Sequence, residues 1–412
     1  MVARSESSFP RADPFHVATA AAIGIALFSL AWALLHTGPF DDAAIVDTPV
    51  YQAYGDRIVD GRDVPYRDFE LEYPPGALPV FVIPALGAGA DYEALFQLVM
   101  LVCGAAAVAL VPVALAASGA GAGPLYGGVG LAALSPLLLG PVILTRFDLW
   151  PALLLAAALA ALASDRGRLG AGLLALAVAA KLYAAVVLPL ALLYLWRRRD
   201  GREAGIALGV FVGVLGLVFA PFLALSPDGV VASFEQQLGR PLQVESLGAG
   251  ALLAADRLGL YRAEVVSSHG SQNLAGGLPD ALATAQTVIG ALAVLAVWML
   301  FARGPAAPAR LLTASAAAVC AFVAFGKVLS PQFLVWLIPL VPLVGGRRGL
   351  VPAGLLAGAL LLTQLWFPSR YWDVVAVEPV AWLVVCRDAV LVALAVALAA
   401  LTAREPEARG SP

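Results

Sequence analysis

The sequence predicts an all-α polytopic membrane protein, a single integral membrane domain over residues 1–412 with about 11–13 transmembrane helices. Hydrophobic residues make up 61% of the chain and charged residues only 13%, whereas soluble proteins carry about a quarter charged residues. Apolar runs of about 20 residues, the length that crosses roughly 30 Å of hydrocarbon, recur from end to end. Arginines gather in the short turns between these runs.

The N-terminal part predicts a cytoplasmic tail, a first span and a polar loop. Residues 1–14 carry arginines, and no small-residue cleavage site follows the apolar run 15–35, which therefore reads as a retained anchor. The loop 37–73 is rich in acids: between Asp41 and Glu72 there are nine acids against three arginines. We expect this first outer loop to meet water and to carry function.

The remaining spans follow from the apolar runs, and their orientation follows from the arginines. The predicted spans are 75–90, 94–117, 124–144, 148–164, 204–225, 281–302, 311–326, 331–345, 349–367 and 379–401. Basic turns lie at 196–202, 302–310 and 346–348, and the positive-inside rule places them, with the tail 403–412, in the cytoplasm. The loops 37–73, 226–278, 327–332 and 368–378 then face the outside.

The segment 169–196 has two interpretations. It is apolar except for Lys181 in its middle, and arginines flank it on both sides. Two short half-helices with Lys181 near the outer tip would keep both flanks cytoplasmic, whereas one long tilted span would not.

Ionisable residues at membrane depth are costly and usually functional. Lys181 has two interpretations. Its partner is either an anionic headgroup or phosphate, or an acid of the protein with which it forms a private pair. Arg146 and Asp148 lie at a helix boundary, where a structural ion pair is the alternative to a binding role. Lys327 marks an outer helix end and is interpreted as a ligand for an anion or as an interfacial anchor.

Other residues are expected to be structural. Arg387 and Asp388 should form a structural ion pair. The predicted aromatic-belt anchors are Trp150, Trp336, Trp366 and Trp372.

The outer loop 226–278 carries a second polar cluster. Arg240, Gln243 and Glu245 lie close together, and His269 follows in a second polar stretch. Several groups that hold hydroxyls, on the same face as the acidic loop, favour a sugar-type ligand.

This layout suits one chemistry. The chain has no phosphate-binding glycine loop after a strand, no His/Cys cluster with zinc spacing, and no basic cluster for nucleic acid. Its three cysteines fall inside apolar runs, so no loop disulfide is implied. Carboxylates on an outer loop with cations at membrane depth suit transfer from a lipid-linked phosphate donor: the cations hold the leaving phosphate and a carboxylate acts as general base. We expect no cofactor and no metal ligands, although a divalent metal stays open.

Six motifs occur in one order: DTPVY, EYPPG, TRFDLWPALL, AAKLY, GRPLQVES and KVLSPQFLVWLIP. In that order, over about residues 15–345, the chain resembles the GT-C superfamily of polyprenyl-phosphate-sugar-dependent glycosyltransferases. It is most similar to the glycosyltransferase family 87 group, which includes mannosyltransferases. The resemblance implies a GT-C-like helical bundle with outer-face loops, transfer of a sugar such as mannose, and a membrane lipid or glycan acceptor. It also implies a bacterial plasma membrane location with the active site facing outside.

The resemblance also assigns roles to residues. It implies Asp47 as the catalytic aspartate, with Asp41, Asp42, Glu70 and Glu72 as alternatives. It implies that Lys181 and Arg146 line the donor phosphate cavity, and we add Lys327 to these cations. The acceptor or sugar-binding candidates are Tyr51, Glu70, Glu72, Tyr73, Asp148, Arg240, Gln243, Glu245, His269 and Gln332.

Two other function classes fit the composition. A secondary transporter or lipid-glycan flippase would also be a polytopic bundle with intramembrane charge, but it would be expected to show paired repeats, and the two halves show none that is convincing. A non-catalytic scaffold of the cell envelope would need neither Lys181 nor the acidic loop.

Overall fold

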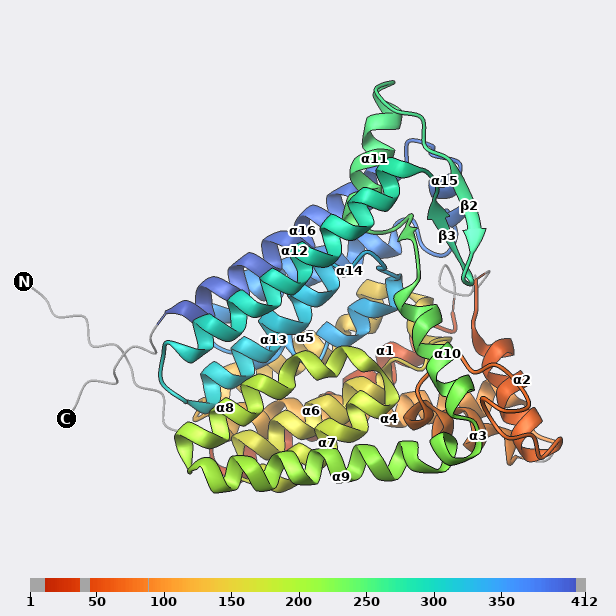
Figure 1. Ribbon diagram of the computed structural model, residues 1–412. Helices are drawn as coiled ribbons and strands as arrows, with labels where there is room; N and C mark the ends of the chain where they lie inside the picture. The colour runs from red at the N-terminus through yellow and green to blue at the C-terminus, as the bar shows by residue number, and fades with distance from the viewer. Residues whose placement is uncertain (1–11, 38–44, 88, 405–412) are drawn as a thin grey trace, which may run out of the picture.

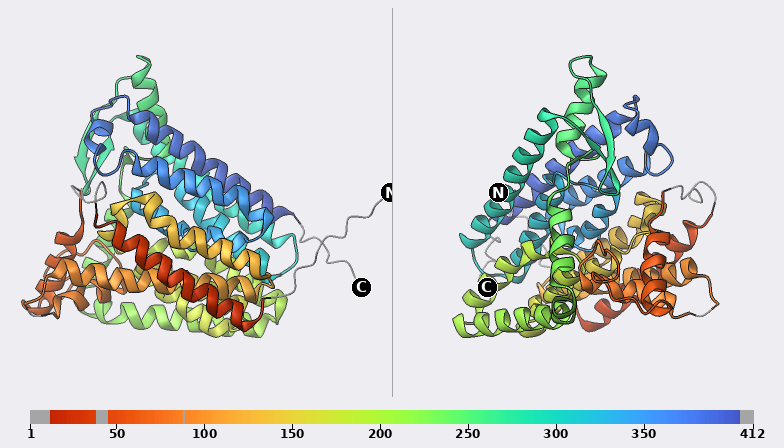
Figure 2. Two further views of the ribbon diagram at one scale, coloured as in Figure 1. Left: turned by 180° about the vertical axis from the view of Figure 1, so that it is seen from behind. Right: turned by 45° about the vertical axis from the view of Figure 1, so that its right-hand side comes forward.

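The computed structural model describes residues 12–37, 45–87 and 89–404 as a bundle of helices with a small sheet at one end (Figure 1). Helix α1 (Pro14–Leu34) begins and helix α16 (Ala381–Ala403) ends at the same end of the bundle, which we name the arginine end. At the opposite end, the cap end, short helices and three strands gather (Figures 1 and 2). The all-α class is thus confirmed.

The first half of the chain builds one side of the bundle. Aspartates begin α1 and α4: Asp13 accepts from the His16 N–H at 2.8 Å, and Asp91 from the Glu93 N–H at 3.0 Å. The helices of this half are α1 (Pro14–Leu34), α2 (Thr48–Val59), η2 (Pro75–Ala77), α3 (Leu78–Ala85), α4 (Tyr92–Ala117), α5 (Ala122–Leu139), η3 (Pro141–Leu144) and α6 (Leu149–Ala163).

Small residues let the first helices approach closely. A Cβ added at Gly24 of α1 would lie 2.7 Å from Val129 of α5 and 2.8 Å from Val108 of α4. Such contacts replace the hydrophobic driving force that lipid does not provide.

The segment 169–196 folds as a broken hairpin. It consists of α7 (Gly167–Ala180), η4 (Leu182–Val187) and α8 (Leu188–Arg198), with Lys181 extended at the break. The flanking turns meet: Arg198 lies 2.8 Å from Asp165, and Arg168 lies 2.7 Å from Glu203. The hairpin interpretation is therefore correct, and a single tilted span is wrong.

The cap is built mostly from the loop between α9 and α12. Its strands form an antiparallel sheet in the order β1-β3-β2, in which Leu242 and Val265 both pair with Leu274. These elements are α9 (Gly201–Leu225), α10 (Pro227–Leu238), β1 (Leu242–Gln243), α11 (Leu247–Arg257), β2 (Val265–Ser268), β3 (Ser271–Leu274) and α12 (Gly277–Ala302).

The last part of the chain fills the centre and returns to the arginine end. Fourteen of the 17 residues of α13 are buried, whereas only two of the 25 residues of α9 are. The elements are α13 (Pro308–Ala324), η5 (Pro331–Leu337), η6 (Val341–Val344), η7 (Arg347–Gly349), α14 (Leu350–Gln364), α15 (Tyr371–Val375) and α16 (Ala381–Ala403).

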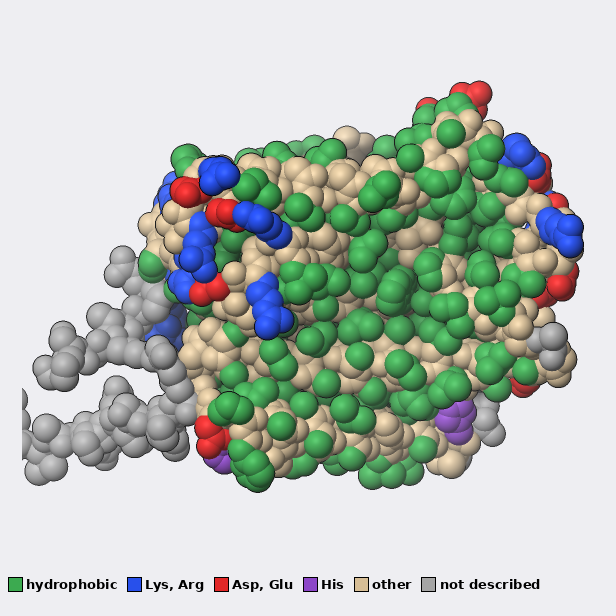
Figure 3. Space-filling model, turned by 90° about the horizontal axis from the view of Figure 1, so that it is seen from below, with side chains coloured by type: hydrophobic (Ala, Val, Ile, Leu, Met, Phe, Trp, Pro, Cys, Tyr) green, Lys and Arg blue, Asp and Glu red, His purple; other side chains and the backbone are tan. Residues whose placement is uncertain are grey.

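The surface carries a broad apolar band between charged ends. Figure 3 shows hydrophobic side chains across the middle, with Lys and Arg gathered at one end and further charges at the other. Within the described residues, six helices are long and apolar enough to cross a membrane, and shorter apolar helices accompany them. The chain is a multi-pass membrane protein.

Two sequence expectations need correction. Residues 331–345 do not form one membrane-length helix but two short 3₁₀ helices, because Pro339 and Pro342 lack the N–H that a continuous α-helix needs. Trp336 and Trp366 are buried, only 2% and 0% exposed, so neither is an aromatic-belt anchor. The Arg387–Asp388 pair is confirmed at 2.7 Å.

Candidate active site

Asp47 stands directly before α2, and its carboxylate points to Arg146. Pro49 suits the first turn of a helix, where a missing N–H costs nothing. An aspartate before a helix commonly caps the first backbone N–H groups, but the Asp47 side chain makes no such bond. Its Oδ2 lies 3.1 Å from Arg146 Nε and accepts from the Tyr51 hydroxyl at 3.3 Å. One cation and one hydroxyl therefore hold this carboxylate against the bundle.

Arg146 lies in the turn between η3 and α6, and its side chain is 4% exposed. Nη2 donates to the Ile45 carbonyl at 3.2 Å, and Nη1 donates to Thr145 Oγ1 at 3.3 Å. The Nε–H is close to Asp47 but is not aimed at it, so it forms no hydrogen bond. Arg146 thus ties the first outer loop to the bundle and keeps one buried donor unsatisfied.

Asp148, two residues further on, binds a different cation. Its Oδ1 lies 2.7 Å from Lys181 Nζ and accepts from Trp336 Nε1 at 2.5 Å. The Asp148 side chain is 1% exposed and that of Lys181 is 15% exposed. Asp47 therefore pairs with Arg146, and Asp148 pairs with Lys181. The sequence neighbours Arg146 and Asp148 do not pair with each other.

An aromatic cage surrounds the Lys181 ammonium. The nitrogen lies 4.6–5.8 Å from the centroids of four rings, a range in which cation–π attraction is favourable. The Trp336 ring is itself stacked on Tyr183 at 3.9 Å. The four rings belong to Tyr73, Phe147, Phe333 and Trp336.

Phe147 lies between Arg146 and Asp148 in the chain and connects the site to α2 and the first outer loop. Its ring lies 5.6 Å from the Tyr51 ring and 4.8 Å from the Tyr73 ring, in edge-on contacts. Tyr51 also stacks on Phe81 at 4.6 Å. These contacts place α2 and the loop before η2 against the turn that carries both Arg146 and Asp148.

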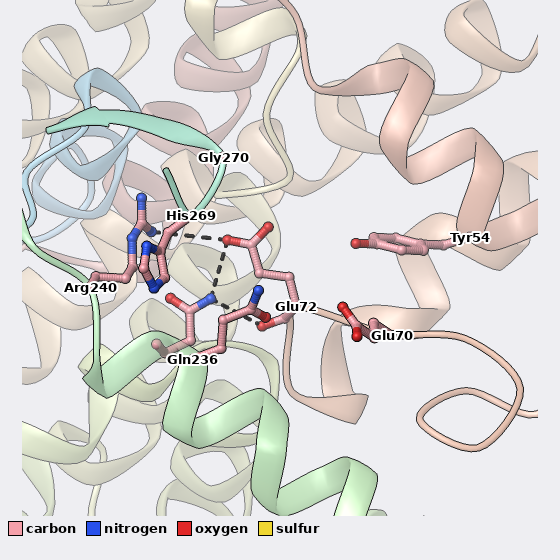
Figure 4. A pocket seen from close by; sticks show the side chains of 8 residues that line it. Tyr54, Glu70, Glu72, Gln236, Arg240, His269 and Gly270 are labelled. Carbon is pink, nitrogen blue, oxygen red and sulfur yellow. Dashed lines mark hydrogen bonds and ion pairs between the residues drawn. The ribbon is translucent and has the colours of Figure 1, made fainter. Parts of the chain in front are cut away.

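A polar pocket of about 170 Å³ opens beside this cluster, at the cap end (Figure 4). Its walls come from α2, the first outer loop, α10 and the β2–β3 turn. The lining residues are Tyr54, Glu70, Glu72, Gln236, Gln237, Arg240, His269 and Gly270.

Glu72 is the centre of the hydrogen bonds in the pocket. Gln237 Nε2 donates to Glu72 Oε1 at 3.1 Å, and Arg240 Nη1 lies 4.0 Å from the same oxygen. Arg240 Nη2 also donates to Ser271 Oγ at 3.1 Å. His269 has a φ of +52°, in the left-handed region that non-glycine residues rarely adopt. The tight β2–β3 turn thus presents its imidazole at the pocket.

Gln243 and Glu245 do not line this pocket; both side chains are buried. Gln243 Nε2 donates to Ser330 Oγ at 2.9 Å, and the Glu245 carbonyl accepts from Arg387 Nη2 at 2.6 Å. Burial raises the pKa of the Glu245 carboxyl to about 8, against the opposing effect of Arg387. Both residues join the cap to the bundle.

The last two sequence candidates lie on the loop after α13 and on η5. Lys327 Nζ donates to the Leu238 carbonyl at 2.9 Å, at the C-terminus of α10 where a cation is favourable. Burial, with Arg240 nearby, lowers the pKa of the Lys327 amine. Gln332 is half-buried at the start of η5.

The structure therefore divides the predicted residues into three groups. Asp47, Tyr51, Tyr73, Arg146, Asp148 and Lys181 form the paired cluster; Glu70, Glu72, Arg240 and His269 line the pocket; Gln243, Glu245, Lys327 and Gln332 lie between cap and bundle. Asp41 and Asp42 lie outside the described residues. Among the described residues, no group of three or more His, Cys, Asp and Glu side chains is arranged to hold a metal ion.

Sequence reasoning missed several residues that complete the site. Phe147, Phe333 and Trp336 form much of the lysine cage, although all three lie inside the motifs TRFDLWPALL and KVLSPQFLVWLIP. Tyr54 and Gln237 line the pocket without any motif. The sequence did hold a signal for Tyr54. It follows the candidate Tyr51 by three residues, which is about one helical turn.

Comparison with known proteins gives a family and a similar solved structure. The sequence model described as Glycosyltransferase family 87 matches residues 71–331. A crystal structure of ArnT from Cupriavidus metallidurans bound to undecaprenyl phosphate is similar, with 14% identity and a TM-score of 0.48, over 95% of this chain and 78% of that one. None of the curated proteins matches the chain.

Proposed function

The chain belongs to glycosyltransferase family 87, and from this premise we propose that it moves a sugar, expected to be mannose, from a polyprenyl-phosphate donor to a lipid or glycan acceptor. The observation that carries the proposal is the pair formed by Asp47 and Arg146 beside a polar pocket. A general base and a phosphate-binding cation are the two groups that this reaction needs.

The donor phosphate is assigned to Arg146. A guanidinium binds phosphate oxygens with directed N–H groups, and the buried Nε–H of Arg146 has no hydrogen-bond partner among the described residues. Lys181 and Lys327 are the further cation candidates. As the bond between the sugar C1 and the phosphate oxygen breaks, positive charge here stabilises the polyprenyl phosphate that leaves.

The base is assigned to Asp47. The acceptor hydroxyl oxygen forms the new bond to the sugar C1, and its proton passes to the carboxylate. Asp47 is 29% exposed, whereas Asp148 is 1% exposed and already bound to Lys181 and Trp336. Of these two acids, Asp47 is the one that a substrate reaches.

The acceptor is assigned to the pocket of Glu70, Glu72, Arg240 and His269. Carboxylate, amide and guanidinium groups hold sugar hydroxyls by hydrogen bonds, and the Tyr54 ring adds an apolar face. The pocket lies at the cap end, opposite the arginine-rich turns. By the positive-inside rule the cap end then faces the outside of a bacterial plasma membrane.

The test is direct transfer. Purified protein is incubated with radiolabelled polyprenyl-phosphate mannose, or another polyprenyl-phosphate sugar, and with membrane lipid extract. We expect label in a lipid or glycan product and release of polyprenyl phosphate. Label that stays in the donor with every sugar and extract would reject the proposal.

A further inference from the structure

The two acid–cation pairs at the site differ in how firmly they are held. Asp148 receives Lys181 and the indole N–H of Trp336 on the same oxygen, with four rings around the ammonium. Asp47 receives one hydroxyl at 3.3 Å and a guanidinium N–H that is not aimed at it. The first pair is enclosed, and the second is a loose contact at a partly exposed carboxylate.

Arg146 has little room for a second anion while Asp47 stays on it. Nη1 binds both Thr145 oxygens and Nη2 binds the Ile45 carbonyl, which leaves the Nε–H edge and one N–H of Nη2 for an anion; the Asp47 carboxylate lies 3.1 Å from Nε at this edge. A phosphate that takes this edge meets the Asp47 carboxylate at contact distance, and two anions so close repel each other. One of them has to move, and the Asp47 side chain, which is 29% exposed and makes no capping hydrogen bond to α2, is the one that can turn away.

We propose that Asp47 and the donor phosphate occupy Arg146 in turn. The carboxylate is the resting partner of the guanidinium, and arrival of the phosphate displaces it toward the acceptor pocket. The base is then released only when the donor is in place. The acceptor hydroxyl therefore loses its proton only when a donor sugar is present to react with it. Asp47 thereby serves both as base and as the placeholder of the phosphate. This inference rests on the proposed function.

Asp47 belongs to the same segment of the chain as several residues that line the pocket. Asp47 precedes α2, and Tyr54 on the same helix already lines the pocket. Tyr51, which contacts Asp47, packs against Tyr73, the direct neighbour of Glu72. A side-chain rotation at the start of α2 changes no helix packing, so the exchange requires no rearrangement of the bundle.

The test measures binding of undecaprenyl phosphate, which carries no sugar and is not turned over. Asp47→Asn keeps the size of the side chain but removes the competing charge. We expect this variant to bind about two- to five-fold more tightly than wild type, the range that loss of a partly exposed ion pair gives. Asp60→Asn removes an exposed acid of the same loop that does not line the pocket, and its affinity should match wild type.

A second measurement follows the carboxylate itself. A water-soluble carbodiimide with an amine nucleophile labels accessible carboxylates, and mass spectrometry reads the Asp47 peptide. We expect Asp47 labelling to rise when undecaprenyl phosphate is added, while Asp60 labelling stays constant.

Three outcomes separate the inference from the function. Tighter binding by Asp47→Asn with ligand-dependent labelling supports the exchange. Equal or weaker binding by Asp47→Asn, with labelling that ligand does not change, overturns the exchange and leaves the transferase intact. Wild type that fails to bind undecaprenyl phosphate overturns the donor assignment and the exchange together.

Discussion

Lys181 and Asp148, 33 residues apart in sequence, form a buried ion pair with 2.7 Å between Nζ and Oδ1. The pair closes the break between α7 and η4 onto the turn before α6. It also supplies the acid partner that one of the two interpretations of Lys181 requires. A donor phosphate that used Lys181 would have to share it with Asp148.

The first prediction concerns this pair. Lys181→Met leaves Asp148 buried without its cation, and breaking a buried pair from one side costs about 3–5 kcal/mol. We expect a clearly lower melting temperature in detergent, with or without undecaprenyl phosphate. Adding Asp148→Asn to Lys181→Met should recover part of the loss. A single variant that melts like wild type but no longer gains stability from the ligand would return Lys181 to the phosphate site.

The second prediction concerns the base. Asp47→Asn keeps size and hydrogen bonding but removes the proton acceptor, so turnover should fall at least about 10²-fold. Undecaprenyl phosphate should still bind. The comparison variants are Glu70→Gln and Glu72→Gln, assayed for sugar transfer under the same conditions. An active Asp47→Asn beside an inactive Glu72→Gln would move the base to the pocket.

The third prediction concerns the acceptor. Arg240→Met removes the guanidinium that faces Glu72 and Ser271. We expect KM for the acceptor to rise several-fold with the donor affinity unchanged, because the pocket is separate from Arg146. Steady-state kinetics with each substrate varied in turn provides the measurement. A change confined to the donor KM would mean that the pocket serves the donor sugar.

The fourth prediction concerns pH. Burial raises the pKa of the Glu245 carboxyl from 4.5 to about 8 in the folded protein. A folded pKa above the unfolded one means that the stability of the neutral form is fully present below pH 4.5 and is lost as pH rises through 8. We expect a lower melting temperature at pH 8.5 than at pH 5.5, and a smaller difference in Glu245→Gln. Equal differences in both proteins would show that other groups set the dependence.

The fifth prediction concerns orientation. In a protein without Cys386, which is exposed, single cysteines are placed by Asp60→Cys, Ser267→Cys and Trp372→Cys at the cap end and by Asp200→Cys at the arginine end. An impermeant maleimide added to intact cells should label the first three and leave the fourth unreacted. Labelling at position 200 with protection at position 60 would invert the protein in the membrane.

The sequence was sufficient for the class and the family, because these depend on local signals, and it offered the hairpin as one of two interpretations of residues 169–196. Apolar run length predicts a membrane helix, and arginines on both sides of Lys181 indicate a hairpin. The ion pairs could not be predicted from the sequence. Arg146 and Asp148 are two residues apart, yet each binds a partner about 30 or more residues away. That choice depends on the tertiary contacts around the turn, among them those of the Phe147 ring with Tyr51 and with the Lys181 ammonium. The burial of Glu245 likewise depends on how the cap sits on the bundle, and that of Trp336 on its stacking against Tyr183 and Phe333.

Helix α9 has a consequence for the pocket. Only Ala207 and Phe211 of its 25 residues are buried, so lipid tails, and not protein, surround most of it. Its length of about 37 Å exceeds a hydrocarbon layer of roughly 30 Å, and such a helix adapts to the bilayer by tilting. Helix α10 follows directly after Ser226 and carries Gln236 and Gln237 into the pocket wall. We therefore expect acyl-chain length in reconstituted vesicles to change acceptor affinity, so that bilayer thickness becomes a variable of the enzyme's specificity.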